Sequence, residues 1–299
     1  MDRKDFLRKS LLGTSVLVSG AAAASVLRND IDELKPLDPV GFDHLPPTPP
    51  ERMENMVLHR ASERGTADHG WLKANFSFSF ANHYDPTRMH FGVLRVMNDD
   101  IIAAGKGFGT HPHDNMEIIT IPLKGALQHK DSMGNTSIIN AGDVQVMSAG
   151  TGVVHAEYNM EPGKTTLFQI WIIPDRRGVK PSWGAKQFPK EKREAGFEVL
   201  ASGRPGDAVT EEQRAAGATA PLPINVDGAV LAATLKKGQT LVQPLAEGRA
   251  AYIVPAKGAV TVNGTAANAR DGIAIRDETS VTITATEDTE LVMVEVAAD

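Results

Sequence analysis

Two glycine-led segments between residues 105 and 157 each place two potential metal ligands two residues apart. His111 and His113 follow one glycine-rich turn, and His155 and Glu157 follow another. In a β-strand, residues two apart point to the same face, so each pair can act on one side of a sheet. If the two strands are neighbours, four ligand side chains converge. The spacing therefore predicts a metal site built by His111, His113, His155 and Glu157.

The donor set also restricts the metal. Three imidazoles and one carboxylate, in a chain of 299 residues with no cysteine, suit one divalent transition ion such as Fe(II), Mn(II), Ni(II), Cu(II) or Zn(II). Ligands that all come from one rigid sheet leave the opposite side of the ion free for water, dioxygen or a chelating substrate. The pattern is typical of a catalytic site and not of a closed structural one.

The alternative is that these histidines merely pack or form hydrogen bonds. With nine histidines in the chain, one His-x-His pair is a weak signal, and the second pair with its glycine turn makes the metal site the better interpretation. Spacing alone does not decide which glutamate supplies the carboxylate ligand. Glu117 lies four residues after His113, on the same strand face, so either Glu117 or Glu157 can supply it.

The surrounding sequence predicts an all-β fold. Residues 76–80 alternate aromatic and polar side chains, and residues 91–98 and 116–123 are further strand candidates, with a turn expected at 98–100. Short strands separated by Gly, Asn and Asp favour an antiparallel barrel of the jelly-roll type. One helix is expected at 210–218, where Thr210 offers a cap.

An internal repeat predicts a second barrel of the same topology. The segment at 255–259 resembles the one at 122–126, and the segment at 269–275 resembles the one at 140–146. The offset between the paired segments falls from 133 to 129 residues, which a hairpin four residues shorter in the second unit explains, so the segments indicate a repeated unit. Because His155 is the last histidine of the chain, the second barrel is expected to have no metal site of this kind.

The ends and borders of the domains follow from composition. Residues 1–24 combine a basic start with an apolar run and a small-residue cluster, which predicts an export signal, twin-arginine-like or Sec, and a periplasmic location, without a permanent membrane span. Residues 25–55 are proline-rich and predict a linker. The N-terminal metal-binding domain is expected at 56–184 and the C-terminal domain, without a metal site, at 185–299.

Net charge argues against a nucleic-acid partner. The chain carries a formal charge of -6, and removal of the basic residues 1–24, which contribute +2, leaves about -8 for the rest. No run of basic residues interrupts this acidic chain, so the phosphate backbone of DNA or RNA would be repelled.

The residues of these motifs resemble those of the pirin family of the cupin superfamily. The similarity runs from about residue 57 to near the C-terminus. It rests on Phe91-Gly-Val-Leu-Arg-Val-Met-Asn98, Gly107-Phe-Gly-Thr-His-Pro-His113, Asn115-Met-Glu-Ile118, His129-Lys-Asp-Ser132, Gly142-Asp-Val-Gln145, Ala149-Gly150, His155-Ala-Glu157 and Gln169-Ile-Trp171. Two positions depart from the family pattern, since Val146 stands where Trp is usual and Ala156 where Ser is usual. Neither is a ligand position.

The resemblance implies a fold, a ligand set and an activity. The fold is a bicupin, with two tandem barrels, and the N-terminal barrel holds one metal, preferably Fe(II), through the residues that match His111, His113, His155 and Glu157. Glu157 is thereby favoured over Glu117, and it is also the candidate catalytic base. The implied activity is a quercetin 2,3-dioxygenase that cleaves a flavonol, a small phenolic substrate, with O2. The oligomeric state stays open.

The resemblance also implies a function of a different class. Some pirins are iron-binding, redox-responsive interaction modules that bind partner proteins without turnover. An acidic chain with an export signal does not suit a role on DNA, so such a module would act outside the cytoplasm. Turnover of a phenolic compound in oxygen distinguishes the enzyme from the module.

Overall fold

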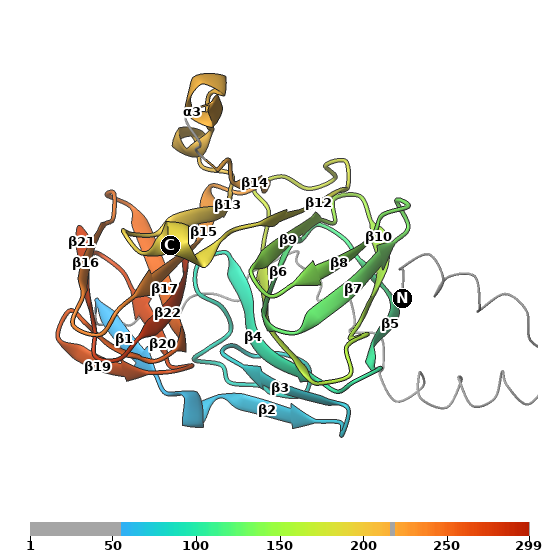
Figure 1. Ribbon diagram of the computed structural model, residues 1–299, viewed down its shortest axis with the longest axis horizontal. Helices are drawn as coiled ribbons and strands as arrows, with labels where there is room; N and C mark the ends of the chain where they lie inside the picture. Colours follow the sequence, from blue (N-terminus) through green and yellow to red (C-terminus); the bar gives the residue numbers. More distant parts are fainter. Residues whose placement is uncertain (1–54, 216–218, 299) are drawn as a thin grey trace, which may run out of the picture. The chain divides into compact units, whose positions relative to one another are not determined.

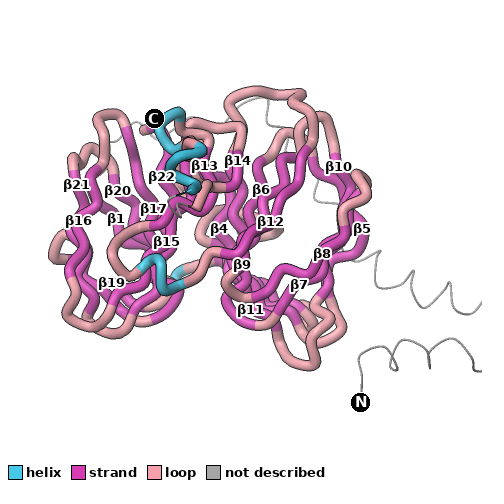
Figure 2. Tube along the Cα trace, turned by 45° about the horizontal axis from the view of Figure 1, so that its top comes forward, coloured by secondary structure: helices cyan, strands magenta, loops and turns pink. Residues whose placement is uncertain are grey.

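The computed structural model describes residues 55–215 and 219–298, and these residues form mainly β-strands (Figures 1 and 2). The expected export signal at 1–24 and all but the last residue of the expected linker lie outside the described residues. The described helical segments are short: α3 (Glu211–Ala215) and three 3-10 turns at Ala61–Glu63, Lys190–Arg193 and Pro205–Asp207. No helix within these described ranges is long and apolar enough to span a membrane.

The first barrel consists of a seven-stranded and a four-stranded antiparallel sheet. The larger sheet has the strand order β12-β9-β6-β11-β4-β3-β2, and the smaller one has the order β5-β10-β7-β8. The strands are β2 (Gly65–Asp68), β3 (Leu72–Phe76), β4 (Leu94–Ile102), β5 (Gly107–His113), β6 (Glu117–Lys124), β7 (Ala126–Asp131), β8 (Thr136–Asn140), β9 (Asp143–Ser148), β10 (Val153–Tyr158), β11 (Thr165–Ile172) and β12 (Ser182–Gln187).

The second barrel repeats this arrangement. Its larger sheet has the order β1-β20-β17-β22-β15-β13-β14, and its smaller sheet has the order β16-β21-β18-β19. The strands are β1 (Met56–His59), β13 (Glu198–Ser202), β14 (Leu222–Pro223), β15 (Gly228–Leu235), β16 (Thr240–Pro244), β17 (Arg249–Lys257), β18 (Ala259–Val262), β19 (Thr265–Asn268), β20 (Gly272–Ile275), β21 (Ser280–Ala285) and β22 (Thr289–Ala297).

The two barrels share one topology. Strands β4 to β11 correspond in order to β15 to β22, and both four-stranded sheets place their strands in the same sequence. The prediction of two tandem jelly-roll barrels is confirmed. One strand crosses between them, because β1 pairs with β20 and so extends the larger sheet of the second barrel, although β2 follows it in the first.

The apolar residues form three clusters, which show what fills each barrel. The largest joins both halves of the chain, with Phe168 and Ile170 from the first barrel and Tyr252 and Val294 from the second. The interior of the second barrel has a cluster of 17 buried residues, whereas the first barrel has one of only six. Much of the first interior is therefore occupied by polar side chains.

One expected turn is wrong. The segment 98–100 lies inside β4, where Asp99 and Asp100 are buried. Asp99 faces the cations of Arg64 and Arg270, at 3.3 and 3.4 Å. Burial, followed by the charges of Asp99 and Glu157, raises the pKa of Asp100 to about 8, so this carboxyl group is mainly neutral at pH 7. Ion pairing and protonation allow a strand where polarity suggests a turn.

Candidate metal centre

The pairing of β5 with β10 brings the two sequence pairs together. His155 lies opposite His111, and the register then shifts so that Glu157 lies opposite Phe108. Between these two pairs, one residue of β10, Ala156, faces two of β5, Gly109 and Thr110; this is a β-bulge, and a bulge re-aims the side chains beside it. Because β5 is an edge strand, Pro112 between the two histidines leaves no gap in a hydrogen-bond ladder on the outer side.

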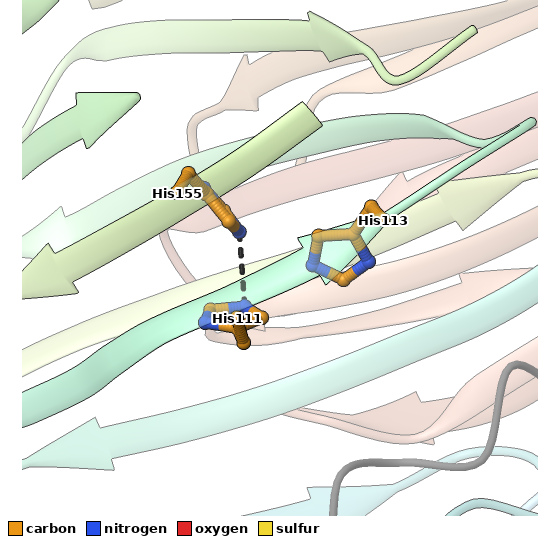
Figure 3. A group of neighbouring side chains, drawn as sticks. All are labelled: His111, His113 and His155. Atoms are coloured by element: carbon orange, nitrogen blue, oxygen red, sulfur yellow. Dashed lines mark hydrogen bonds between the residues drawn. The ribbon is translucent and has the colours of Figure 1, made fainter. Parts of the chain in front are cut away.

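Figure 3 shows the three imidazoles pointing toward one another. One ring nitrogen from each of His111, His113 and His155 lies within 4.8 Å of the other two. The Nε2 atoms of His155 and His111 are 3.0 Å apart. Two nitrogens bound at right angles to one ion, each at about 2.1 Å, would be separated by roughly 3 Å. This separation therefore fits neighbouring ligands of a transition metal.

The protonation pattern fits metal binding as well. The Nδ1 atom of His111 lies 2.7 Å from the carbonyl oxygen of Gly109, which can only accept, so Nδ1 carries the proton. In the neutral ring the lone pair is then on Nε2, the atom that faces His155. The bulged segment of β5 supplies this carbonyl group, so local backbone geometry selects the tautomer needed for a ligand.

Burial keeps two of the imidazoles unprotonated. Burial, followed by the charge of His111, lowers the pKa of His113 to about 3. Burial, followed by the charges of His111, His113 and His129, lowers the pKa of His155 well below its usual range. Since a metal ion binds only the neutral imidazole, these rings need not lose a proton at neutral pH before they bind one.

Glu157 is buried next to the three imidazoles and is held by two neutral amides. Gln145 Nε2 donates to its Oε1 at 2.9 Å, and Gln169 Nε2 donates to its Oε2 at 2.8 Å. Its carboxylate oxygen groups with His155 and His129 within 4.8 Å, and not with His111 and His113 at that limit. Neutral amides bring no positive charge to a buried carboxylate, whereas a bound cation would.

Glu117 takes a different direction from Glu157. Ser148 Oγ donates to its Oε2 at 2.5 Å, and Asn225 Nδ2, from the second half of the chain, donates to its Oε1 at 3.2 Å. Burial raises the pKa of Glu117. Within the described residues Glu117 belongs to neither group of potential metal ligands. Its contacts are those of a link between the barrels.

A polar network surrounds Glu157 and fixes the amides that hold it. Trp183 Nε1 on β12 donates to Gln145 Oε1 at 3.0 Å, and Thr120 Oγ1 bonds both Gln145 Nε2 and Gln169 Oε1. Trp183 also stacks on His129, with ring centroids 5.4 Å apart and an interplanar angle of 15°. Satisfied buried networks of this kind set one side-chain arrangement.

Several residues of this site have no signal in the spacing of motifs. His129 on β7 lies opposite Glu157 of β10, whereas Gln169 on β11 and Trp183 on β12 belong to the larger sheet and reach the site through their side chains. His129 enters the sequence-based expectations only as the first residue of the motif His129-Lys-Asp-Ser132, without a ligand role. Its neighbour Asp131 in the same strand is a usable signal, since a carboxylate two residues from a buried histidine can orient that ring.

The fold and the cluster define a two-barrel cupin with a group of three imidazoles in the N-terminal barrel. The sequence matches the family model Pirin over residues 57–172 and the model for a quercetinase C-terminal cupin domain over residues 215–296. The chain therefore belongs to the pirin family, as its motifs predict.

Named relatives and a solved structure agree with this assignment. A pirin-like protein of Caulobacter vibrioides is 54% identical over 78% of this chain and 96% of its own length. The quercetin 2,3-dioxygenase of Escherichia coli K12 is 42% identical over 80% of this chain and 97% of its own. The crystal structure of bacterial pirin YhhW from Escherichia coli in complex with nickel(II) is 40% identical, covers 82% of this chain and 100% of its own, and has a TM-score of 0.73.

Proposed function

We propose that this protein is a metal-dependent dioxygenase that cleaves a flavonol such as quercetin with O2. The observation that carries the proposal is the convergence of three imidazole nitrogens from β5 and β10 within 4.8 Å, beside a buried carboxylate. A relative at 42% identity with the name quercetin 2,3-dioxygenase supports the choice of substrate class.

In this proposal His111, His113, His155 and Glu157 hold one divalent transition ion. The three histidines already offer their nitrogens at ligand spacing, and Glu157, buried beside His155, would supply the oxygen donor. We infer Fe(II) as the ion of the active enzyme, because nitrogen and oxygen donors without thiolate suit it, and the same donors suit Ni(II), which the relative YhhW binds. The bound ion supplies a Lewis-acidic position for a chelating phenol and for dioxygen.

The residues around the ion have separate tasks. His111 and His113 are partly exposed on the edge strand β5, whereas His155 and Glu157 are buried, so the substrate approaches from the side of β5. Trp171 meets the ring of His113 edge-on at 4.9 Å and offers an aromatic wall to a flat phenolic compound. Glu157 accepts the hydroxyl proton of the flavonol, and Gln145 and Gln169 keep its carboxylate oriented.

The test is anaerobic loading with Fe(II), followed by quercetin and oxygen. The proposal expects oxygen uptake and release of carbon monoxide, lost in His113→Ala and retained in His69→Ala, which changes an exposed histidine. Metal-loaded protein that takes up no oxygen with any of a panel of flavonols would contradict it. The alternative of a redox-responsive interaction module would then be supported by a change in partner binding upon oxidation of the iron.

A further inference from the structure

Two histidine nitrogens in the first barrel are buried without a partner. Of the buried side-chain polar atoms in the described residues, His129 Nδ1 and His155 Nδ1 are among the few that form no hydrogen bond. Their rings lie on neighbouring strands, with centroids 5.4 Å apart and planes tilted by 53°. An unpaired buried polar atom is costly, so two such atoms on neighbouring rings require a reason.

His129 presents an acceptor at its free nitrogen. Its Nε2 lies 3.0 Å from Asp131 Oδ2. The backbone N–H groups of Met133 and Asn135 and the amide of Asn135 also donate to Asp131, so this carboxylate acts as an acceptor throughout. The proton of a neutral His129 ring is therefore on Nε2, and Nδ1 carries a bare lone pair.

His155 requires such an acceptor once its other nitrogen is a ligand. Its Nε2 faces His111 and is the nitrogen that would bind the ion. The remaining proton of the neutral ring is then on Nδ1, in a position with no partner. Metal-bound histidines almost always donate this second N–H to an acceptor, which fixes the ring and makes it a better ligand.

We propose that His129 is a positioning residue for the metal centre: when His155 binds the ion, its ring turns so that its Nδ1–H, unpaired in this structure, is accepted by the Nδ1 of His129. Asp131, His129 and His155 then form one chain of hydrogen bonds that ends at the ion. The inference rests on the proposed metal site and adds to it the group that orients a ligand. Trp183, which stacks on His129, keeps the ring in place.

The second barrel supports this assignment by contrast. In the first barrel His129 lies opposite Glu157, and the corresponding pair of the second barrel is Val262 opposite Ile283. Both aliphatic side chains are buried. The fold therefore does not need a histidine at this position. A histidine opposite a buried carboxylate here indicates a role in the metal centre.

Two other arrangements compete with this one. Glu157 could accept the Nδ1–H of His155 in place of His129, since all three residues have donor or acceptor atoms within 4.8 Å of one another. The same three residues could instead hold a second ion. Each alternative predicts a different result, so one set of measurements separates them.

The experiment uses the full chain loaded with Cu(II) as a spectroscopic probe and with Ni(II) for affinity. Pulsed electron paramagnetic resonance detects the remote nitrogen of a copper-bound imidazole and responds to its hydrogen bond. His129→Phe keeps the stacking on Trp183 but has no acceptor, and it should weaken Ni(II) binding by about 10- to 100-fold and shift one remote-nitrogen signal. His129→Gln supplies an amide oxygen as acceptor and should restore both toward wild type.

The outcomes are distinct. No metal bound by the wild type would contradict the proposed function itself. Metal bound normally by wild type and His129→Phe alike, with the same remote-nitrogen signals, would overturn the inference and point to Glu157 as acceptor. Two ions per wild-type chain and one in His129→Phe would also overturn it, in favour of a second ion. If His129→Phe does not fold, Asp131→Asn replaces it, because an amide donor moves the His129 proton to Nδ1 and should shift the same signal.

Discussion

Histidines of this chain differ in which nitrogen keeps a lone pair and where that lone pair points. His111 is set by the carbonyl oxygen of Gly109, so its Nε2 faces the cluster, whereas His90 bonds the carbonyl oxygen of Gly92 in a loop away from it. A ligand role therefore depends on the backbone around the ring as well as on the His-x-His spacing.

Removal of a ligand ring should abolish metal binding and activity together. We expect His111→Ala and His155→Ala each to lower metal affinity by at least about 100-fold, because the effect of a lost ligand exceeds that of a lost orienting partner. Metal content after dialysis and oxygen uptake with quercetin measure the two losses. His69→Ala is the control, and equal metal content in all three variants would remove the basis of the ligand assignment.

His59 gives the protein a pH-dependent stability that is separate from the metal. Its Nδ1 lies 3.1 Å from the hydroxyl group of Tyr252, and burial, followed by the charges of Arg88 and Arg276, lowers its pKa to about 4. The unfolded chain binds this proton near pH 6.5 and the folded chain does not. The contribution of neutral His59 to the free energy of unfolding is therefore fully present above pH 6.5, and it is lost as the pH decreases from 6.5 toward 4.

His59→Gln should flatten this dependence. The amide keeps a polar partner for Tyr252 but does not titrate, so the stability advantage of wild type over the variant should shrink by roughly 1 kcal/mol per pH unit between pH 6.5 and 4. Urea unfolding at several pH values measures it. Parallel curves for the two proteins across that range would show that His59 titrates alike in the folded and unfolded chains.

Strand β5 positions two histidines through its bulge against β10, and Gly107 allows the close approach. A Cβ atom at Gly107 would overlap the carbonyl oxygen of Glu157 and the backbone of Tyr158, whereas one at Gly109 would come no closer than 3.8 Å to another residue, at the Tyr158 hydroxyl group. The two glycines of one strand therefore have unequal importance.

Gly107→Ala should destabilise the protein and disturb the metal site, and Gly109→Ala should do neither. Overpacking against backbone typically costs about 1–3 kcal/mol, and here it also moves β10 at Glu157. Thermal unfolding and metal affinity measure both effects. Similar values for the two variants would contradict the role of Gly107 in the register.

At this scale the sequence predicts the elements better than their partners. The strand character of 116–123 and the Thr210 cap are readable locally, and Thr210 and Gln213 do form reciprocal cap hydrogen bonds. The turn expected at 98–100 is wrong because the cations that pair with Asp99, from Arg64 and Arg270, are distant in the chain. Likewise, the hydrogen-bond partners of Glu157 depend on the registers of β9 and β11, which no local pattern specifies.

The two barrels have the same topology, which the repeat in the sequence predicts. Their interiors differ, because the first contains polar side chains and the second apolar ones. Where the first barrel has His155 and Glu157 on β10, the second has Val281 and Ile283, both buried. The second barrel, which has no histidine, thus shows that the fold accepts apolar residues at the positions of His155 and Glu157. The small apolar cluster of the first barrel is compensated by the large cluster that both barrels share.

Asn225 is the point where the second half reaches Glu117, and its removal should lower stability without loss of metal. We expect Asn225→Ala to reduce the free energy of unfolding by about 1–3 kcal/mol, because Glu117 and Ser148 each lose a buried donor. Thr282→Ala, at an exposed position, should change it by less than about 0.5 kcal/mol. Metal content that falls in Asn225→Ala alone would return Glu117 to the candidate ligands.

The crossing of β1 has a practical consequence for anyone who wishes to exchange the halves of this protein with those of a relative. A chimera with a single junction after β12 contains β1 from the same protein as the first barrel, although β1 pairs with β20 of the second barrel. Such a hybrid carries a foreign edge on its C-terminal sheet. An exchange that keeps β1 with its own partner strand needs two junctions, one before β2 and one after β12.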